Sequence, residues 1–218
     1  SYKEFTFGGY PAKYLQMEAG DHLIQLLSFG DTTFSTSLQA ASLIFDRKSI
    51  SDVTSILFSV YYDKTIVIDP FKLAPFTLDD SNSIVKFAKY TANIYMYSLN
   101  GEVKNSYGSD PLFLVTVLPN DGVSTNQSIA DKMVSEIQQY GLIGKEFTSA
   151  DTIKIEGVDA LERTFNGNLK WEKKSFYQLV IIHEDKCITI QASCSLGDST
   201  TLAAFKELAN TIKLKKND

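Results

Sequence analysis

The sequence predicts an α+β protein in which helices pack on an antiparallel β-sheet. Three observations support this class: an apolar strand, an amphipathic helix directly after it, and a series of strands joined by short turns before a second helix. Helices packed against an antiparallel sheet define the α+β class. The chain has 218 residues, 44% of them hydrophobic and 22% charged, which is a globular composition and length enough to bury a core.

The C-terminal half opens with a strand and a helix. Residues 112–118 read LFLVTVL, a run with a proline on either side, which is typical of a buried strand. Ser124 and Gln127 then have the spacing of a capping box, and Gly141 stands where a helix commonly ends. Between these ends one apolar stripe recurs at helical spacing, formed by Ile129, Ala130, Met133, Val134, Ile137 and Tyr140.

Three or four strands are predicted after this helix. They cover residues 152–156, 159–165, 171–182 and 187–194. Asn166-Gly167 indicates a hairpin turn, and the polar residues 183–186 turn the chain before the last strand. Because the connections are short, the strands are expected to form an antiparallel meander.

A second helix closes the chain. Asp198 or Ser199 can cap its beginning. Its apolar side consists of Leu202, Phe205, Leu208, Ala209 and Ile212. This helix is expected to pack on the sheet beside the first one.

The N-terminal half is predicted to be rich in β-strands. Strands are expected at residues 2–7, 22–29, 43–45, 55–61, 65–68 and 84–99, the second of which could also be a short helix. Prolines and aspartates interrupt this pattern near residues 71–83. The chain is therefore divided into a β-rich N-terminal portion or subdomain, residues 1–80, and an α+β domain, residues 81–218.

The C-terminal half resembles the PsbP-like superfamily. The resemblance rests on the order of elements across residues 112–214 and on the segment 155–160, IEGVDA, followed by Phe165. Members of the family often carry a glycine and a small residue at the entry to an aromatic-bearing strand. The strand, turn and strand of residues 176–192 are similar as well, whereas the proline–tryptophan segment with which the family usually opens is not found. The resemblance implies a fold and, since most members bind other proteins or act as accessory subunits, a binding role; it transfers no catalytic residue.

Motifs that would indicate catalysis or a cofactor are not found in the sequence. It contains no G-x-S-x-G elbow and no phosphate-binding glycine loop with its lysine, and two cysteines and two histidines are too scattered for a zinc site. No cofactor or metal is therefore expected. His22 and His183 are interpreted as polar residues of a loop edge and a turn, and the acidic pairs at 79–80 and 184–185 as solvated loop residues.

Charge, hydropathy and cysteine content bear on partners and compartment. The net charge of −5 argues against a nucleic-acid partner, and no apolar run reaches the roughly 18 residues of a membrane span. Cys187 and Cys194 lie seven residues apart in one predicted strand, so they should face opposite sides of the sheet and remain unpaired. Unpaired cysteines and the lack of a leader in this chain slightly favour a cytoplasmic location, although an exported form stays open.

Tyrosines suggest a candidate binding surface. Tyr90, Tyr95 and Tyr97 fall close together in one predicted strand segment, and Tyr95 and Tyr97 share a strand face. Tyrosine is favoured at interfaces because its ring is apolar and its edge is polar. The alternative interpretation is that one face of this strand belongs to the core.

Three functional hypotheses follow, and they belong to different classes. The first is a non-catalytic binding or accessory module whose partner is another protein or a peptide. The second is an immunity-type inhibitor that neutralises a toxin through electrostatic complementarity. The third is an enzyme whose site is assembled from distant loop residues. The sequence favours the first and leaves the oligomeric state open.

Overall fold

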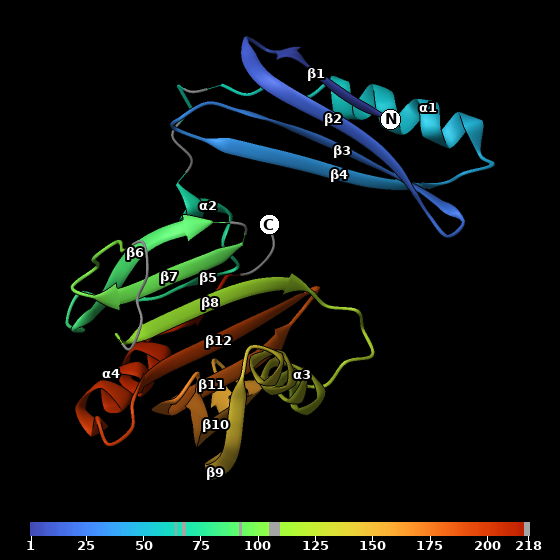
Figure 1. Ribbon diagram of the computed structural model, residues 1–218. Helices are drawn as coiled ribbons and strands as arrows, with labels where there is room; N and C mark the ends of the chain where they lie inside the picture. Colours follow the sequence, from blue (N-terminus) through green and yellow to red (C-terminus); the bar gives the residue numbers. More distant parts are fainter. Residues whose placement is uncertain (64, 67–68, 92, 105–109, 216–218) are drawn as a thin grey trace. The chain divides into compact units, whose positions relative to one another are not determined.

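The computed structural model describes residues 1–63, 65–66, 69–91, 93–104 and 110–215. The chain forms two compact units, Ser1–Ile68 and Asp69–Asp218, each with a hydrophobic core of its own (Figure 1). The sequence pattern predicted a boundary after residue 80. The structure divides the chain earlier, because Ala74 and Phe76 are buried in the core of the second unit.

The first unit is a four-stranded antiparallel meander with one helix packed on it (Figure 1). Its elements are β1 (Tyr2–Phe7), β2 (Tyr10–Ala19), β3 (His22–Gly30), β4 (Ser35–Leu43) and α1 (Arg47–Phe58). The core between sheet and helix consists of Ala12, Tyr14, Leu27, Phe29 and Leu57. The predicted strands at residues 2–7 and 22–29 are confirmed, and β2 was not foreseen.

Residues 55–61 do not form the predicted strand, because α1 runs through most of them. Asp46 caps this helix by accepting a hydrogen bond from the Ser49 amide at 3.0 Å. Val53 and Leu57, four residues apart, then pack on the sheet, so the gain from burial outweighs the strand propensity of the segment. Of the predicted strand 43–45 only the first residue belongs to β4, and the predicted strand 65–68 lies partly outside the described residues.

A buried glutamine ties α1 to the sheet. Gln25 of β3 is fully buried, and its Oε1 accepts hydrogen bonds from the Tyr14 hydroxyl and, at 2.8 Å, from the Thr54 hydroxyl. Its Nε2 donates to the Ile50 carbonyl at 3.3 Å. Since a buried amide without partners is costly, these bonds fix the position of the helix over β2 and β3.

We expect Gln25→Ala to lower the unfolding free energy of the first unit by about 1–3 kcal/mol, the cost of leaving buried polar partners unsatisfied. Urea titration with peptide-resolved hydrogen exchange in β2 and α1 measures this loss. The matched control is Lys48→Ala on α1, where the side chain is exposed and the change should be close to zero. Equal effects of the two substitutions would contradict the anchoring role of Gln25.

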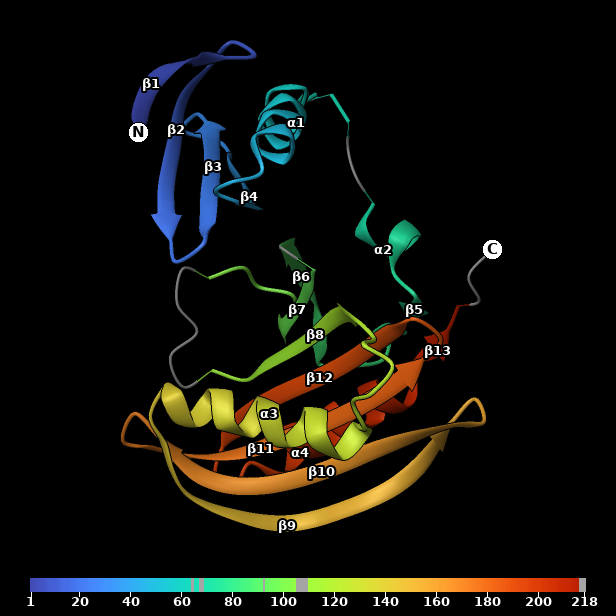
Figure 2. The same ribbon diagram turned by 90° about the vertical axis from the view of Figure 1, so that its right-hand side faces the viewer.

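The second unit contains a seven-stranded antiparallel sheet in the order β6-β7-β8-β12-β11-β10-β9, and β5 pairs separately with β13. Its elements are α2 (Pro70–Leu73), β5 (Phe76–Thr77), β6 (Val85–Thr91), β7 (Ile94–Leu99), β8 (Leu112–Pro119), α3 (Asn126–Gln139), β9 (Leu142–Ile155), β10 (Val158–Leu169), β11 (Glu172–His183), β12 (Lys186–Ser195), α4 (Ser199–Asn210) and β13 (Lys213–Leu214). Figure 2 shows β9 and β10 as long, curved strands. The predicted α+β class and the antiparallel meander β9 to β12 are confirmed.

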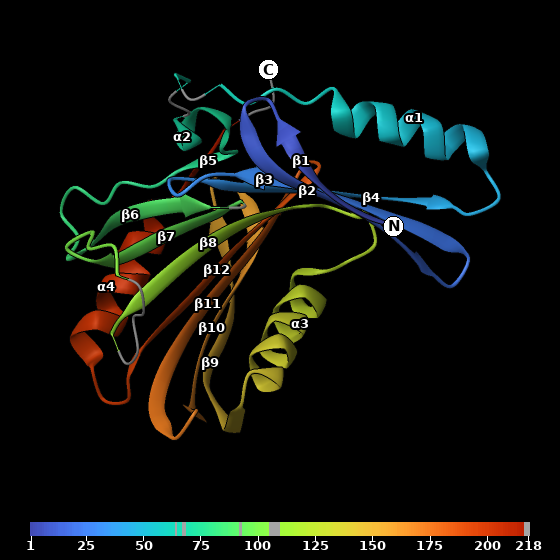
Figure 3. The same ribbon diagram turned by 45° about the horizontal axis from the view of Figure 1, so that its top comes forward.

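Helices α3 and α4 lie on opposite faces of this sheet, and not side by side as expected (Figure 3). The alternation along β11 shows why. Phe176 and Val180 belong to the clusters under α3, whereas Tyr177 and Leu179 belong to the cluster under α4. A strand that is apolar on both faces needs cover on both, so each helix takes one face.

The hairpin between β10 and β11 lies further along the chain than predicted. β10 continues through Asn166-Gly167 and turns at Lys170-Trp171, where φ is +50° and +75°. Two successive residues with positive φ are typical of the turns that join antiparallel strands. Gly167 instead allows β10 and β9 to approach closely, because a Cβ at this position would lie 2.6 Å from a methyl carbon of Leu142 on β9. Strand β9 is also longer than the predicted strand 152–156.

The caps of the two long helices follow the predicted chemistry with one shift. A capping box begins α3, but it joins Thr125 and Ser128 rather than the predicted Ser124 and Gln127. Asp198 caps α4 by accepting a hydrogen bond from a backbone amide at 3.0 Å, as predicted. Local side-chain bonding therefore sets where both helices begin.

Candidate functional site

The three tyrosines suggested as a binding surface do not share an exposed face. Tyr95 and Tyr97 are only 4% and 1% exposed, because α2 and β5 belong to the same core cluster on that side of the sheet. The Tyr95 hydroxyl donates to the Pro70 carbonyl at 2.9 Å, and burial raises the pKa of Tyr95 to about 12. Tyr90 alone is exposed, with its hydroxyl donating to Asn93 at 3.1 Å. The predicted surface is thus wrong for Tyr95 and Tyr97, which are core residues.

Each histidine lies next to the acidic residue that adjoins it in the sequence. His22 is half-exposed and lies 2.6 Å from its neighbour Asp21, and His183 is 3.9 Å from its neighbour Glu184. Within the described ranges, no three His, Cys, Asp or Glu side chains gather as metal ligands would. None of the described helices is both long and apolar enough to cross a membrane.

The cysteines are free and lie on opposite faces of β12, as their spacing predicted. Cys187 packs in a cluster under α3 and Cys194 in the cluster under α4. Burial raises the pKa of each thiol to about 11, so neither is a thiolate near neutral pH. They are structural residues of the core.

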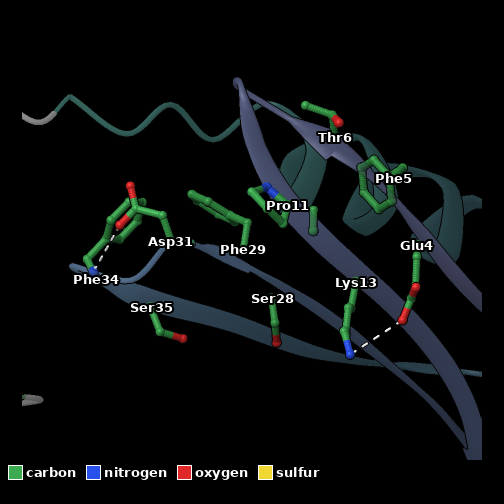
Figure 4. Close-up of a pocket in the computed structure, with 12 residues that line it drawn as sticks. Glu4, Phe5, Thr6, Pro11, Lys13, Ser28, Phe29, Asp31, Phe34 and Ser35 are labelled. Atoms are coloured by element: carbon green, nitrogen blue, oxygen red, sulfur yellow. Dashed lines mark hydrogen bonds and ion pairs between the residues drawn. The ribbon is translucent and has the colours of Figure 1, made fainter.

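One depression of about 450 Å³ lies on the first unit, at the end of the sheet near the β3–β4 turn (Figure 4). Several of its polar groups already have partners within the unit. Glu4 and Lys13 form an exposed ion pair at 3.4 Å, and Asp31 accepts hydrogen bonds from the Thr33 and Phe34 amides at 2.7 and 3.3 Å. The Asp31 hydrogen bonds close the turn before β4, and the Glu4–Lys13 pair joins β1 to β2.

A second depression, of about 460 Å³, runs beside α3 on the sheet of the second unit. We refer to it as the α3 groove. Strands β7, β8 and β12 form its floor, and α3 forms one wall. The apolar residues that line it are Ile94, Leu114, Leu118, Ile129, Met133, Ile137 and Tyr140.

The groove exists because α3 covers only part of its face of the sheet. On the opposite face, β8 buries Phe113 and Val115 completely. On the groove face the alternating residues of the same strand are less covered: Leu114 is half-buried and Leu118 is 46% exposed. The groove is therefore an incomplete layer over an apolar floor, at the part of the face that α3 does not reach.

The apolar stripe of α3 is divided between core and groove. Ala130 and Val134 are fully buried against the sheet. Met133 is half-buried along the groove, and Tyr140, at the end of the helix, is 73% exposed. The stripe is therefore wider than the helix needs for its own packing, which is the one sequence feature that could have located the groove.

A buried polar network leads beneath α3 to the groove floor. Arg163 of β10 is 2% exposed, donates to Asp131 of α3 at 2.7 Å and to Gln178 at 3.1 Å, and lies 5.0 Å from the ring centre of Phe147. Gln178 in turn donates to Gln191 at 2.7 Å. The Nε2 of Gln191 is buried and, among the described residues, has no hydrogen-bond partner. The network thus ends at an unused donor in the groove floor.

Hydrogen bonds from Arg163 and then from Gln127 hold the pKa of Asp131 below its usual range. A lowered carboxyl pKa contributes stability that is present above the unfolded-state value, about 3.9, and is lost as pH falls through the folded-state value. We expect Asp131→Asn to lower stability at neutral pH by up to about 1 kcal/mol, because the Asp131 side chain is 57% exposed and water screens its ion pair with Arg163, and to flatten the loss of stability in acid.

Urea unfolding at a series of pH values tests the Asp131 interaction. The matched control is Glu136→Gln, on the same helix, for which no ion pair is found among the described residues. If the two variants gave parallel stability profiles, the Arg163 interaction would not be the source of the effect.

Proteins similar to this chain are found among solved structures. No family model matches the sequence, and no curated protein matches it. Several solved structures match. Protein PA94 of unknown function from Pseudomonas aeruginosa is 13% identical with a TM-score of 0.47, covering 60% of this chain and 88% of that one. The cyanobacterial PsbP of Synechocystis sp. PCC 6803 is 15% identical with a TM-score of 0.41, covering 70% and 99%.

A third match extends over both units. The type VI secretion immunity protein TplEi of Pseudomonas aeruginosa is 9% identical with a TM-score of 0.47, covering 99% of this chain and 76% of that one. A PsbP protein, whose superfamily the C-terminal half was found to resemble, is thus among the matching structures, as are an immunity protein and a protein of unknown function. Similarity at these identities describes the fold and not a site.

Proposed function

We propose that this chain is a non-catalytic binding module that receives an amphipathic helix of a partner protein in the α3 groove. The observation that carries the proposal is the unfinished helical layer over an apolar floor. Leu114 and Met133 line it from the sheet and from α3, and Leu118 and Tyr140 extend it to the surface. Transfer of the partner's apolar side chains from water into the groove would supply most of the binding free energy.

The dimensions of the sheet favour a helix as the occupant. α3 contacts β9, β10 and β11. Beyond the next strand, β12, the face continues over β8 and β7. Two strand spacings amount to about 10 Å, and a helix with its side chains is about 10–12 Å wide. One further helix therefore fits beside α3, in the manner in which helices fill grooves on other binding proteins.

Polar groups at the groove define the chemistry of the partner. Gln191 offers its unused amide donor at the floor, which a hydroxyl or amide oxygen of the partner would accept. Lys132 and Glu136 line the groove from α3 with one charge of each sign. The partner helix should then carry an apolar face with a single polar residue, flanked by both acidic and basic side chains.

Capture from a lysate of the source cells, with immobilised wild-type chain and two double variants, tests the proposal. Leu118→Glu with Tyr140→Glu introduces charge into the groove at exposed positions. Val123→Glu with Ile143→Glu adds the same charge at exposed apolar positions outside it. We expect a protein that binds the wild type and the control double variant and loses affinity for the groove variant by at least about tenfold, since each lost apolar contact is worth about 1.5–3 kcal/mol.

The captured protein should also bind through a helix, and a peptide of that helix should compete with it. A partner held equally by both double variants would contradict the groove as the site. Unchanged circular dichroism of the groove variant is the control for folding.

Toxin inhibition is a second candidate, favoured by the net charge of −5. An inhibitor that recognises a basic active site would depend on electrostatic attraction, so its affinity would fall steeply with salt. The affinity of a partner bound in the apolar groove would change little with salt. Measuring the affinity of the captured protein at low and moderate salt therefore distinguishes the two candidates.

A further inference from the structure

Strand β4 forms an open edge of the four-stranded sheet. It is the last strand in the order β1-β2-β3-β4, and it pairs with β3 over nine consecutive residue pairs without a shift of register. One backbone hydrogen bond reaches its outer side, from the Asp46 amide to the Leu43 carbonyl at 3.0 Å, where the strand ends; among the described residues none reaches the outer groups of residues 35–41. An edge of this kind presents a row of amide and carbonyl groups to any strand that can align with it.

The other sheet edges carry the features that commonly prevent pairing. β1 bears Lys3 and Glu4. β6 bears Lys86 and Lys89 with a bulge between its pairs to β7, and β9 bears several charges and two irregularities in its register. β4 reads STSLQAASL, with no charge, no proline and no bulge. Of these four edges, β4 alone lacks protection against edge-to-edge association.

Two backbone hydrogen bonds determine which residues of β4 point outward. The Asp31 amide donates to the Phe34 carbonyl at 2.9 Å, and the Ile44 amide donates to the Asp21 carbonyl at 3.0 Å. Hydrogen-bonded pairs alternate along an antiparallel ladder, so every second residue of β4 bonds to β3. The residues whose amides and carbonyls point outward are then Ser35, Ser37, Gln39, Ala41 and Leu43, all of them exposed.

We propose that two copies of this chain associate through antiparallel pairing of their β4 strands, with a two-fold axis at Gln39. Outward residues then meet outward residues, Ser37 opposite Ala41 of the second copy and Ser35 opposite Leu43. Because the set is symmetric about Gln39, the same edge serves both copies, as an isologous interface requires. The result is a continuous eight-stranded sheet.

The charge distribution favours a second copy as the occupant. Two chains that each carry a net charge of −5 repel one another, and β4 is an edge at which they can meet without opposing like charges. Pairing also consumes both β4 edges. The remaining edge of each sheet is β1, with Lys3 and Glu4, so the assembly closes at two copies.

Sedimentation equilibrium of the full chain at a series of concentrations tests the proposal. We expect the wild type to show a dimer mass that falls toward the monomer on dilution. Gln39→Lys places two like charges together at the axis and should yield a monomer with unchanged circular dichroism. The matched control, Thr6→Lys, makes the same change at an exposed position of β1 and should remain dimeric.

Amide-resolved hydrogen exchange provides a second measurement that needs no variant. In the dimer the amides of Ser37, Gln39 and Ala41 should be protected from exchange, as should that of Ala40, which bonds to β3. Dilution should remove the protection of the three outward amides and leave that of Ala40 unchanged. A monomer at every concentration, or a dimer in which the Gln39 amide exchanges freely, would overturn the proposal. A monomer that protects these amides only on adding an unrelated extended peptide would also overturn it, and would assign the edge to another partner.

The dimer is independent of the proposed function. The double variant Leu118→Glu with Tyr140→Glu should dimerise as the wild type does, and Gln39→Lys should still bind the groove partner. A result that contradicts one proposal therefore does not bear on the other.

Discussion

The second unit depends on one constraint: β11, an inner strand of its sheet, is apolar on both faces. Phe176 and Val180 point to one side, and Tyr177, Leu179 and Ile181 to the other. Neither set can face water without a large loss of burial energy, so the sheet must be covered twice. The short connections on either side of β11 hold β10 and β12 as its neighbours, and the two helices at the ends of the meander supply the two layers.

The two layers are unequal, and the candidate site follows from that inequality. α2, β5 and α4 together contribute to the cluster that buries Tyr97 and Phe113 on one face. On the other face, α3 is the helix that packs on the sheet among the described elements, and its width is enough for roughly half of a seven-stranded sheet. Arg163 is accommodated beneath it because Asp131, Gln178 and the ring of Phe147 replace the water that the guanidinium loses.

Much of the second unit could be predicted from the sequence, because its signals are local. The stripe from Ile129 to Tyr140 defines α3, and the capping chemistry of Asp198 defines the start of α4. The hairpin was wrongly predicted at Asn166-Gly167, because Gly167 is needed for its close contact with Leu142, a residue more than twenty positions away in the chain. For the same reason the end of α1, residues 55–58, was predicted to be part of a strand: the packing of Val53 and Leu57 on the sheet outweighs local propensity.

The sequence by itself determined the α+β class, the antiparallel meander, the opposite faces of Cys187 and Cys194, and the fact that Tyr95 and Tyr97 share one side of a strand. It did so because alternation and helical periodicity are properties of neighbouring residues. Only the tertiary structure decided which side is covered. Strand alternation defines two faces, but the cover of each comes from elements distant in the chain, so the tyrosines became core and the groove opened on the other side.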